Sequence, residues 1–172
     1  MKKVLFILSI LDDHDVTWLA ESGTRRTIEP GEVLITEGGP LAAVFLALEG
    51  RFSVSVRGRE IAQVGAGEVL GEVSFVDRYP PTATVTAIQK SRVLEVSRAI
   101  LERKIANDVA FSSRFYLAVC TFLADRLRGT LGQLSNTLST DDGLQELDLD
   151  RLDAVSRAGE RFKRVLQTLS AR

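Results

Sequence analysis

The stretch from Gly71 to Val85, GEVSFVDRYPPTATV, decides how this chain folds. Its Gly-Glu opening is typical of a turn that presents backbone N–H groups to an anion. A short helical turn after it would add the positive end of its dipole, and the Glu72 carboxylate could accept hydrogen bonds from a sugar hydroxyl. The stretch ends in a strand, because Val85 alternates with threonines. It therefore predicts a ligand-holding loop between two strands.

The segment around this loop, Thr24 to Val96, has the texture of an all-β unit. Short β-branched runs alternate in it with glycines. In the clearest strand, Arg51 to Arg57, Phe52 and Val54 alternate with polar residues, and the RGRE that follows predicts a hairpin turn. Strands at this spacing indicate a β-sandwich or a jelly roll. We expect a mainly β fold, an antiparallel double-stranded jelly-roll barrel with an N-terminal helix and C-terminal helices.

Helical periodicity flanks the β unit on both sides. The Asp12-Asp13 pair predicts the start of an N-terminal helix, which Gly23 would end. After Val96 we expect a short helix capped by Ser97 and a long helix that begins near Asp108. The long helix has one apolar stripe suited to packing on the β unit, made of Phe111, Phe115, Val119, Phe122 and Leu123.

A second apolar stripe on the long helix has the 3-4 spacing of helices that pair with one another. The other interpretation is a single wide stripe facing the core, and Gly129 and Gly132 weaken the helix where a seam should be firmest. We predict a homodimer through this seam. Its residues are Leu117, Cys120, Ala124, Leu127, Leu131, Leu134 and Leu138.

The C-terminal part of the chain is a polar loop followed by an amphipathic segment, Asp148 to Leu169. Its apolar face must dock on something: the long helix in cis, a groove on a dimer mate, or another protein. We therefore divide the chain into a jelly-roll domain with its helices, residues 1–130, and a helical extension, residues 131–172.

Composition and charge exclude several classes of function. The 172 residues have a formal net charge of −1, so no overall basic field favours nucleic acid or an anionic membrane. Lysines and an apolar run at the start resemble a signal peptide, but aspartates interrupt the run. No segment approaches the roughly 18 apolar residues of a membrane span. The lone Cys120 cannot form an intrachain disulfide, so we expect a cytoplasmic protein.

Catalysis is not indicated either. A metal-dependent jelly-roll enzyme needs several converging ligands, whereas this chain has one histidine, His14, at the start of a surface helix. A serine nucleophile or Cys120 would need a histidine base, and His14 lies outside the β unit. We expect no enzyme and no metal site.

Two quoted runs resemble the cyclic-nucleotide-binding domain family, which includes the catabolite activator protein and the regulatory subunits of cyclic-AMP-dependent kinase. They are PGEVLITEGGPLAAVFLALEG and IAQVGAGEVLGEVSFVDRYPPTATVTA. The resemblance implies an eight-stranded jelly roll and a phosphate-binding cassette. Gly71 and Glu72 would hold the cyclic phosphate and the ribose hydroxyl, and the other implied site positions are Val73, Ser74, Thr82 and Ala83.

One cassette position departs from the family. The family has an arginine nine residues after the glutamate, where this chain has Pro81. Losing one partner of a buried charge pair costs about 2–5 kcal/mol, and proline offers no N–H in exchange. We therefore predict a non-catalytic regulatory or interaction module that needs no cofactor and binds cyclic nucleotides weakly or not at all.

Two other functions stay open at this point. A genuine sensor of cyclic AMP or cyclic GMP would use Glu72, the backbone amides and possibly Arg78, three residues before Pro81. A DNA-binding regulator is disfavoured, because the residues after Thr130 offer one amphipathic helix and no helix-turn-helix. Beyond the homodimer, a protein partner is compatible with the sequence, and DNA or a membrane is not expected.

Overall fold

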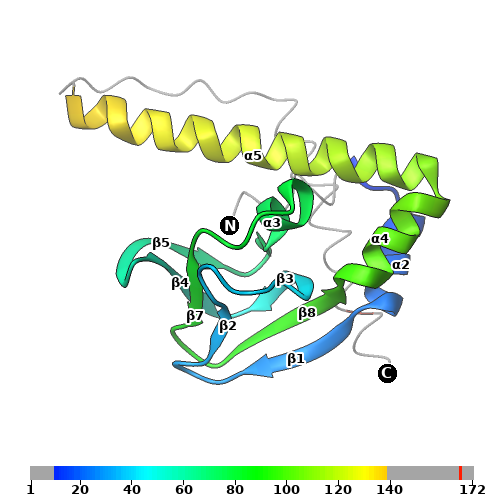
Figure 1. The fold of residues 1–172 in the computed structure, drawn as a ribbon, viewed down its shortest axis with the longest axis horizontal. Helices are drawn as coiled ribbons and strands as arrows, with labels where there is room; N and C mark the ends of the chain where they lie inside the picture. The colour runs from blue at the N-terminus through cyan, green and yellow to red at the C-terminus, as the bar shows by residue number, and fades with distance from the viewer. Residues whose placement is uncertain (1–9, 139–166, 168–172) are drawn as a thin grey trace.

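The computed structural model describes residues 10–138 and Gln167, and it contains two four-stranded antiparallel sheets. One sheet has the order β1-β8-β3-β6 and the other the order β2-β7-β4-β5. Figure 1 shows the two sheets wrapped into a β-roll beside the helices. The predicted mainly β fold is confirmed. The strands are β1 Thr24–Ile28, β2 Val33–Ile35, β3 Ala43–Glu49, β4 Arg51–Val56, β5 Arg59–Gly65, β6 Val69–Leu70, β7 Thr84–Ala87 and β8 Ser91–Ser97.

Strand β3 is buried on both faces because it lies between two hydrophobic clusters. Phe45 and Ala47 belong to the cluster between the sheets, which Phe52 and Val54 of β4 also join. Val44, one position out of step, belongs to the cluster under the helices. Side chains of a strand point to alternate faces, so a strand between two layers needs apolar residues at every position. The alternating strand β4 has only one buried face, as predicted.

The helix α2, Asp13–Ser22, begins with a capping box. The Asp12 carboxylate accepts a hydrogen bond from the Asp15 N–H at 2.8 Å, and Asp15 accepts one from the Asp12 N–H at 3.1 Å. Gly23 ends the helix, as predicted, but its backbone is extended and not left-handed. A Cβ there would lie 2.5 Å from Leu94 Cδ1. Close packing against β8 explains this glycine.

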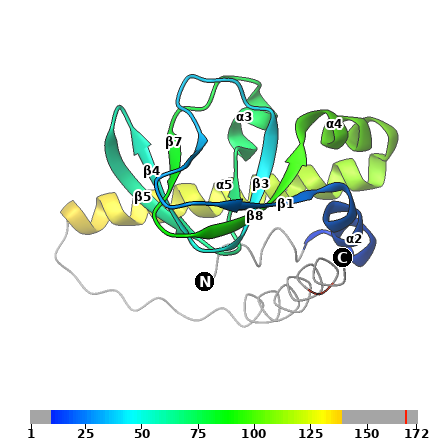
Figure 2. The same ribbon diagram turned by 90° about the horizontal axis from the view of Figure 1, so that it is seen from below.

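The remaining helices are α3 Glu72–Asp77, α4 Arg98–Asn107 and α5 Val109–Leu138. Ser97 is the N-cap residue of α4, as predicted, but its hydroxyl makes no capping hydrogen bond. Asp108 accepts a hydrogen bond from the Phe111 N–H at 2.9 Å in the first turn of α5. Figures 1 and 2 both place α2 and α4 at one end of the β-roll, with α5 running along the roll past α3.

An ion pair with a buried carboxylate ties α2 to α5. Asp15 is fully buried, and its carboxylate accepts hydrogen bonds from Arg114 Nε at 2.6 Å and Nη2 at 2.9 Å. Burial alone would raise the pKa of Asp15, but the hydrogen bonds from Arg114 and from the backbone outweigh it and hold that pKa below its usual value. Two segments 99 residues apart are thereby fixed to each other.

The two stripes of α5 have different environments. Phe111, Phe115, Val119 and Phe122 are buried against the sheet and α2, as predicted for the inner stripe. In the outer stripe, Leu117, Leu127 and Leu131 are 58%, 61% and 55% exposed. The side chains of Leu134 and Leu138 lie outside the described residues, as does the predicted segment 148–169 apart from Gln167. Helix α5 continues past residue 130 to Leu138. The division of the chain at residue 130 stays a prediction.

None of the helices in the part of the chain that the structure describes is both long enough and apolar enough to cross a membrane.

Candidate ligand-binding site

The loop between β6 and α3 depends on a glycine. Gly71 has a φ of 87°, in the left-handed region, and is the N-cap residue of α3. A Cβ at this position would lie 3.1 Å from Leu41 Cδ1 and 3.3 Å from the Ala43 carbonyl oxygen. Glycine satisfies both constraints, since it tolerates positive φ and needs no side-chain space. The turn thus places Glu72 in the first turn of α3.

A pocket with a cavity volume of about 80 Å³ lies beside this turn. The structure brings together around it most of the predicted site positions: Gly71, Glu72, Val73, Ser74, Thr82, Ala83 and the departing Pro81. The other walls are apolar, apart from one arginine. They are formed by Ile35, Val54, Leu70, Val85 and Arg126. The cassette residues therefore converge on one concave site.

Pro81 makes one wall of the pocket neutral. Its ring is buried, and its carbonyl oxygen accepts a hydrogen bond from the Gly38 N–H at 2.7 Å. That bond joins the cassette to the turn after β2. Because proline has neither an N–H nor a charged side chain, Pro81 itself offers no donor to an anionic ligand.

Arg78 is not among the residues that line the pocket. It is exposed, at the C-cap of α3, with a φ of 62°. Left-handed backbone is uncommon outside glycine, and the residue takes it here to end the short helix. The geometry gives no support to a role for Arg78 as a substitute cation.

Arg126 of α5 is the cation that reaches the pocket. Its Nη1 donates to Glu72 Oε1 at 3.0 Å. The Glu72 side chain is 3% exposed and that of Arg126 is 39% exposed. Burial raises the pKa of the Glu72 carboxyl, and the charge of Arg126 opposes that rise. The carboxylate expected to hold a ribose hydroxyl is therefore already engaged by a side chain of the same protein.

Sequence reasoning missed Arg126, although one signal was available. Arg126 follows the buried Phe122 by four residues, so it lies on the inner stripe of α5 among apolar positions. A cation on a core-facing stripe requires a buried acidic partner. The buried acidic partner here is Glu72, 54 residues earlier in the chain.

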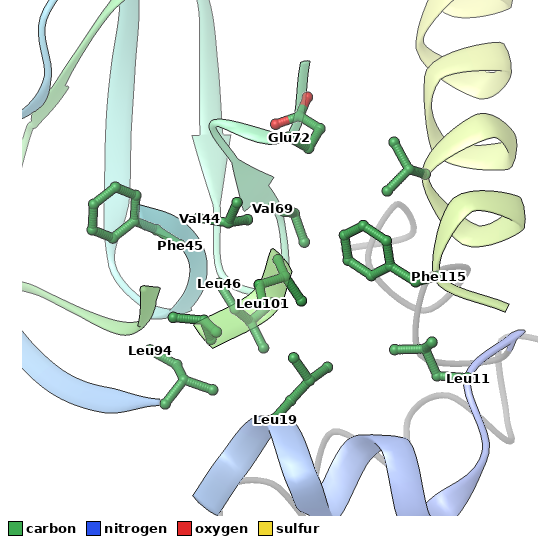
Figure 3. Close-up of a pocket in the computed structure, with 12 residues that line it drawn as sticks. Leu11, Leu19, Val44, Phe45, Leu46, Val69, Glu72, Leu94, Leu101 and Phe115 are labelled. Atoms are coloured by element: carbon green, nitrogen blue, oxygen red, sulfur yellow. The ribbon is translucent and has the colours of Figure 1, made fainter. Parts of the chain in front are cut away.

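A second cavity lies behind the cassette, between the sheet and the helices. It has a volume of about 60 Å³ and apolar walls that include Leu19 of α2, Leu101 of α4 and Phe115 of α5. Figure 3 shows Glu72 at one end of this cavity, with Leu19 and Leu11 at the other. Glu72 lines both cavities and so separates the ligand pocket from the apolar space under the helices.

Arg98 holds the other end of α3. From the start of α4, it donates to the carbonyl oxygens of Ser74 at 3.3 Å and Phe75 at 3.4 Å. Its guanidinium carbon also lies 5.4 Å from the centroid of the Phe75 ring. With Arg126 bound to Glu72, both ends of the cassette helix contact an arginine from a C-terminal helix.

Comparisons with known proteins agree with this architecture. The family model described as "Cyclic nucleotide-binding domain" matches residues 25–108. A cAMP-dependent protein kinase regulatory subunit from Yarrowia lipolytica is 33% identical over 99 residues, which are 56% of this chain and 26% of that protein. The Pycsar effector protein PaPycTIR from Pseudomonas aeruginosa is 42% identical over 82 residues, 47% of this chain and 27% of that one. The chain thus spans about a quarter of the length of these relatives.

A solved structure extends the similarity to the flanking helices. The cyclic nucleotide-binding domain from Methylobacillus flagellatus superposes with a TM-score of 0.70 at 24% identity, over 85% of this chain and 85% of that one. At this identity the likeness concerns the fold alone. The family match over residues 25–108, a range that includes the glycine-dependent cassette, assigns this β-roll to the cyclic nucleotide-binding domain family.

Proposed function

We propose that this chain is a non-catalytic regulatory module of the cyclic nucleotide-binding family that binds cyclic nucleotides weakly or not at all. One observation carries the proposal: Pro81 stands where a phosphate-pairing arginine is expected, and the cation that does reach the pocket, Arg126, is bound to Glu72. A cyclic nucleotide entering the pocket would share that carboxylate with Arg126, which already donates to one of its two oxygens. It would then meet a neutral wall at its phosphate.

Titration calorimetry with cyclic AMP and cyclic GMP tests this proposal. We expect the wild-type protein to show no dissociation constant below about 10 μM for either nucleotide. In Pro81→Arg, the restored charge pair should tighten binding by about thirtyfold or more. Pro80→Arg is the matched control, since Pro80 is exposed and does not line the pocket. Tight binding by the wild-type protein would refute the proposal.

The alternative is a genuine sensor, and the retained pocket favours it. Gly71, Ser74 and the buried Glu72 still converge on one cavity. In a sensor, Arg126 would leave Glu72 when the ligand arrives and α5 would move. Wild-type binding below about 10 μM, abolished by Glu72→Ala, would establish this function.

We also propose that two copies of the chain pair through the outer stripe of α5. The exposed Leu117, Leu127 and Leu131 support this pairing, because a contiguous apolar row on a surface helix marks an interaction site. Sedimentation should reveal a monomer–dimer equilibrium that Leu127→Asp removes. Arg128→Asp adds a carboxylate one residue away and should leave the equilibrium in place. A dimer that Leu127→Asp does not weaken would contradict the proposed seam.

The cytoplasm is the compartment we propose for this module. The lone cysteine, Cys120, is exposed on α5 and forms no disulfide within the chain, which suits a reducing environment.

A further inference from the structure

The outer stripe of α5 is apolar over several turns. Leu117, Leu127 and Leu131 are each more than half exposed, and Cys120 between them is also exposed. Single apolar residues are ordinary on a protein surface, but a row at this spacing is not. In the folded protein something is expected to cover it.

The chain itself contains a segment with the matching pattern. In Asp148–Leu169 the positions at 3-4-3-4-3 spacing are occupied by Leu152, Val155, Gly159, Phe162, Leu166 and Leu169. This is the spacing of the outer stripe, and it is the pattern of two helices that pack along a common seam. The polar residues between these positions would remain in water.

An antiparallel alignment of the segment with α5 also matches residue sizes. It pairs the bulky Phe162 with the small Cys120, and it brings Gly159 against Ala124. Phe162 is thereby set against a smaller side chain, as interdigitated packing requires, and the small Gly159–Ala124 pair lets the two helices approach closely. The leucine and valine pairs of the same alignment are Leu152 with Leu131, Val155 with Leu127, and Leu166 with Leu117.

The length of the chain fits this alignment. Helix α5 ends at Leu138, and nine residues, 139–147, precede the amphipathic segment. They include Gly143 and the polar run STDD, which suit a reversal of chain direction. As a helix, the segment from Leu152 to Leu166 would rise about 21 Å, as does the part of α5 from Leu117 to Leu131 that it faces in this alignment.

We propose that Asp148–Leu169 docks antiparallel on the outer stripe of α5 in the same chain and competes there with a second copy. This inference rests on the proposed role of the stripe as an assembly surface. It adds the regulation of that surface, because the dimer forms when the segment is displaced.

A disulfide in the full-length chain tests the docking directly. Cys120 is the single native cysteine, so Phe162→Cys creates one possible intrachain pair. Under mild oxidation we expect a 120–162 bridge in protein of monomeric mass, identified by peptide mapping. Arg164→Cys is the control, because position 164 lies about 200° around a helix from position 162. A bridge between two chains, equal bridging in the control, or no bridge would overturn the proposal.

The competition has its own measurement. Phe162→Asp places a charge in the docked seam, so the segment should leave α5 and the dimer dissociation constant should fall by about thirtyfold. An unchanged dissociation constant would refute the competition. If Phe162→Asp remained monomeric at every concentration, the proposed dimer would fail, and the 120–162 bridge would still decide whether the segment docks.

Discussion

Replacing Arg126 by methionine removes the cation that binds Glu72 and leaves most of the packing of a long side chain. Removing one partner of a fully buried ion pair lowers the free energy of unfolding by about 3–5 kcal/mol, whereas an exposed pair contributes about 0–1 kcal/mol. Here Glu72 is 3% exposed and Arg126 39% exposed, so the case is intermediate. We expect Arg126→Met to cost about 2 kcal/mol, a fall in melting temperature of about 4–8 °C.

The cost of Arg126→Met should depend on pH. Burial raises the pKa of Glu72, and without Arg126 only a backbone hydrogen bond opposes that rise. A raised pKa in the folded state means that stability falls as pH rises from the unfolded value of about 4.3 through the folded value. The destabilisation should therefore be smaller at pH 5 than at pH 8. Thermal unfolding followed by circular dichroism at both pH values measures it.

Two further variants separate the ion pair from ordinary packing. In a Glu72→Gln background the buried group is neutral, so Arg126→Met should cost no more than about 0.5 kcal/mol. Arg128→Met makes the same chemical change at an exposed position of α5 that does not line the pocket. The reasoning is refuted if Arg126→Met costs no more than Arg128→Met, or if its cost is the same at both pH values.

Two other predictions concern stability away from the pocket. Gly50 has a φ of 95°, and a Cβ there would lie 2.0 Å from Ser91 Oγ, so Gly50→Ala should cost about 2–5 kcal/mol in denaturant unfolding. Gly58→Ala, with a φ of 77° and open space, should cost only about 1 kcal/mol. Asp15→Asn weakens the pair with Arg114 and should lower the free energy of unfolding. Because the pKa of Asp15 is lowered in the folded protein, this loss of stability should be complete at neutral pH. It should disappear as pH falls from about 4 through the lower folded value.

The β-roll was predictable because its signals are local. Glycines at turns and alternation within strands need only neighbouring residues, and Phe52 and Val54 indicated the buried face of β4. The inner stripe of α5 was predictable for the same reason, since its period of 3.6 is visible in a short window. Those patterns sufficed for the β-roll and its flanking helices, whereas the family and the cassette came from the resemblance of the two quoted runs.

The electrostatics of the site were not predictable in this way. The partners Glu72 and Arg126 are 54 residues apart, and the residues around either one do not indicate that the other is its partner. Arg78, the nearer arginine in sequence, was considered instead and lies outside the pocket lining. The need for glycine at position 23 was also not predictable locally, because it arises from the close approach of Leu94 of β8. Contacts between distant segments depend on how the sheets and helices pack together.

The two faces of helix α5 have different surroundings. Arg126 and the buried phenylalanines face the roll, while Leu117, Leu127 and Leu131 face outward. Substitutions at sites that share no contacts act almost independently on free energy. Under the proposed assembly through the outer stripe, substitutions there would change what the protein assembles with while the pocket stays intact, and substitutions in the pocket would leave assembly unchanged. An engineer could exchange one face of this helix without redesigning the other.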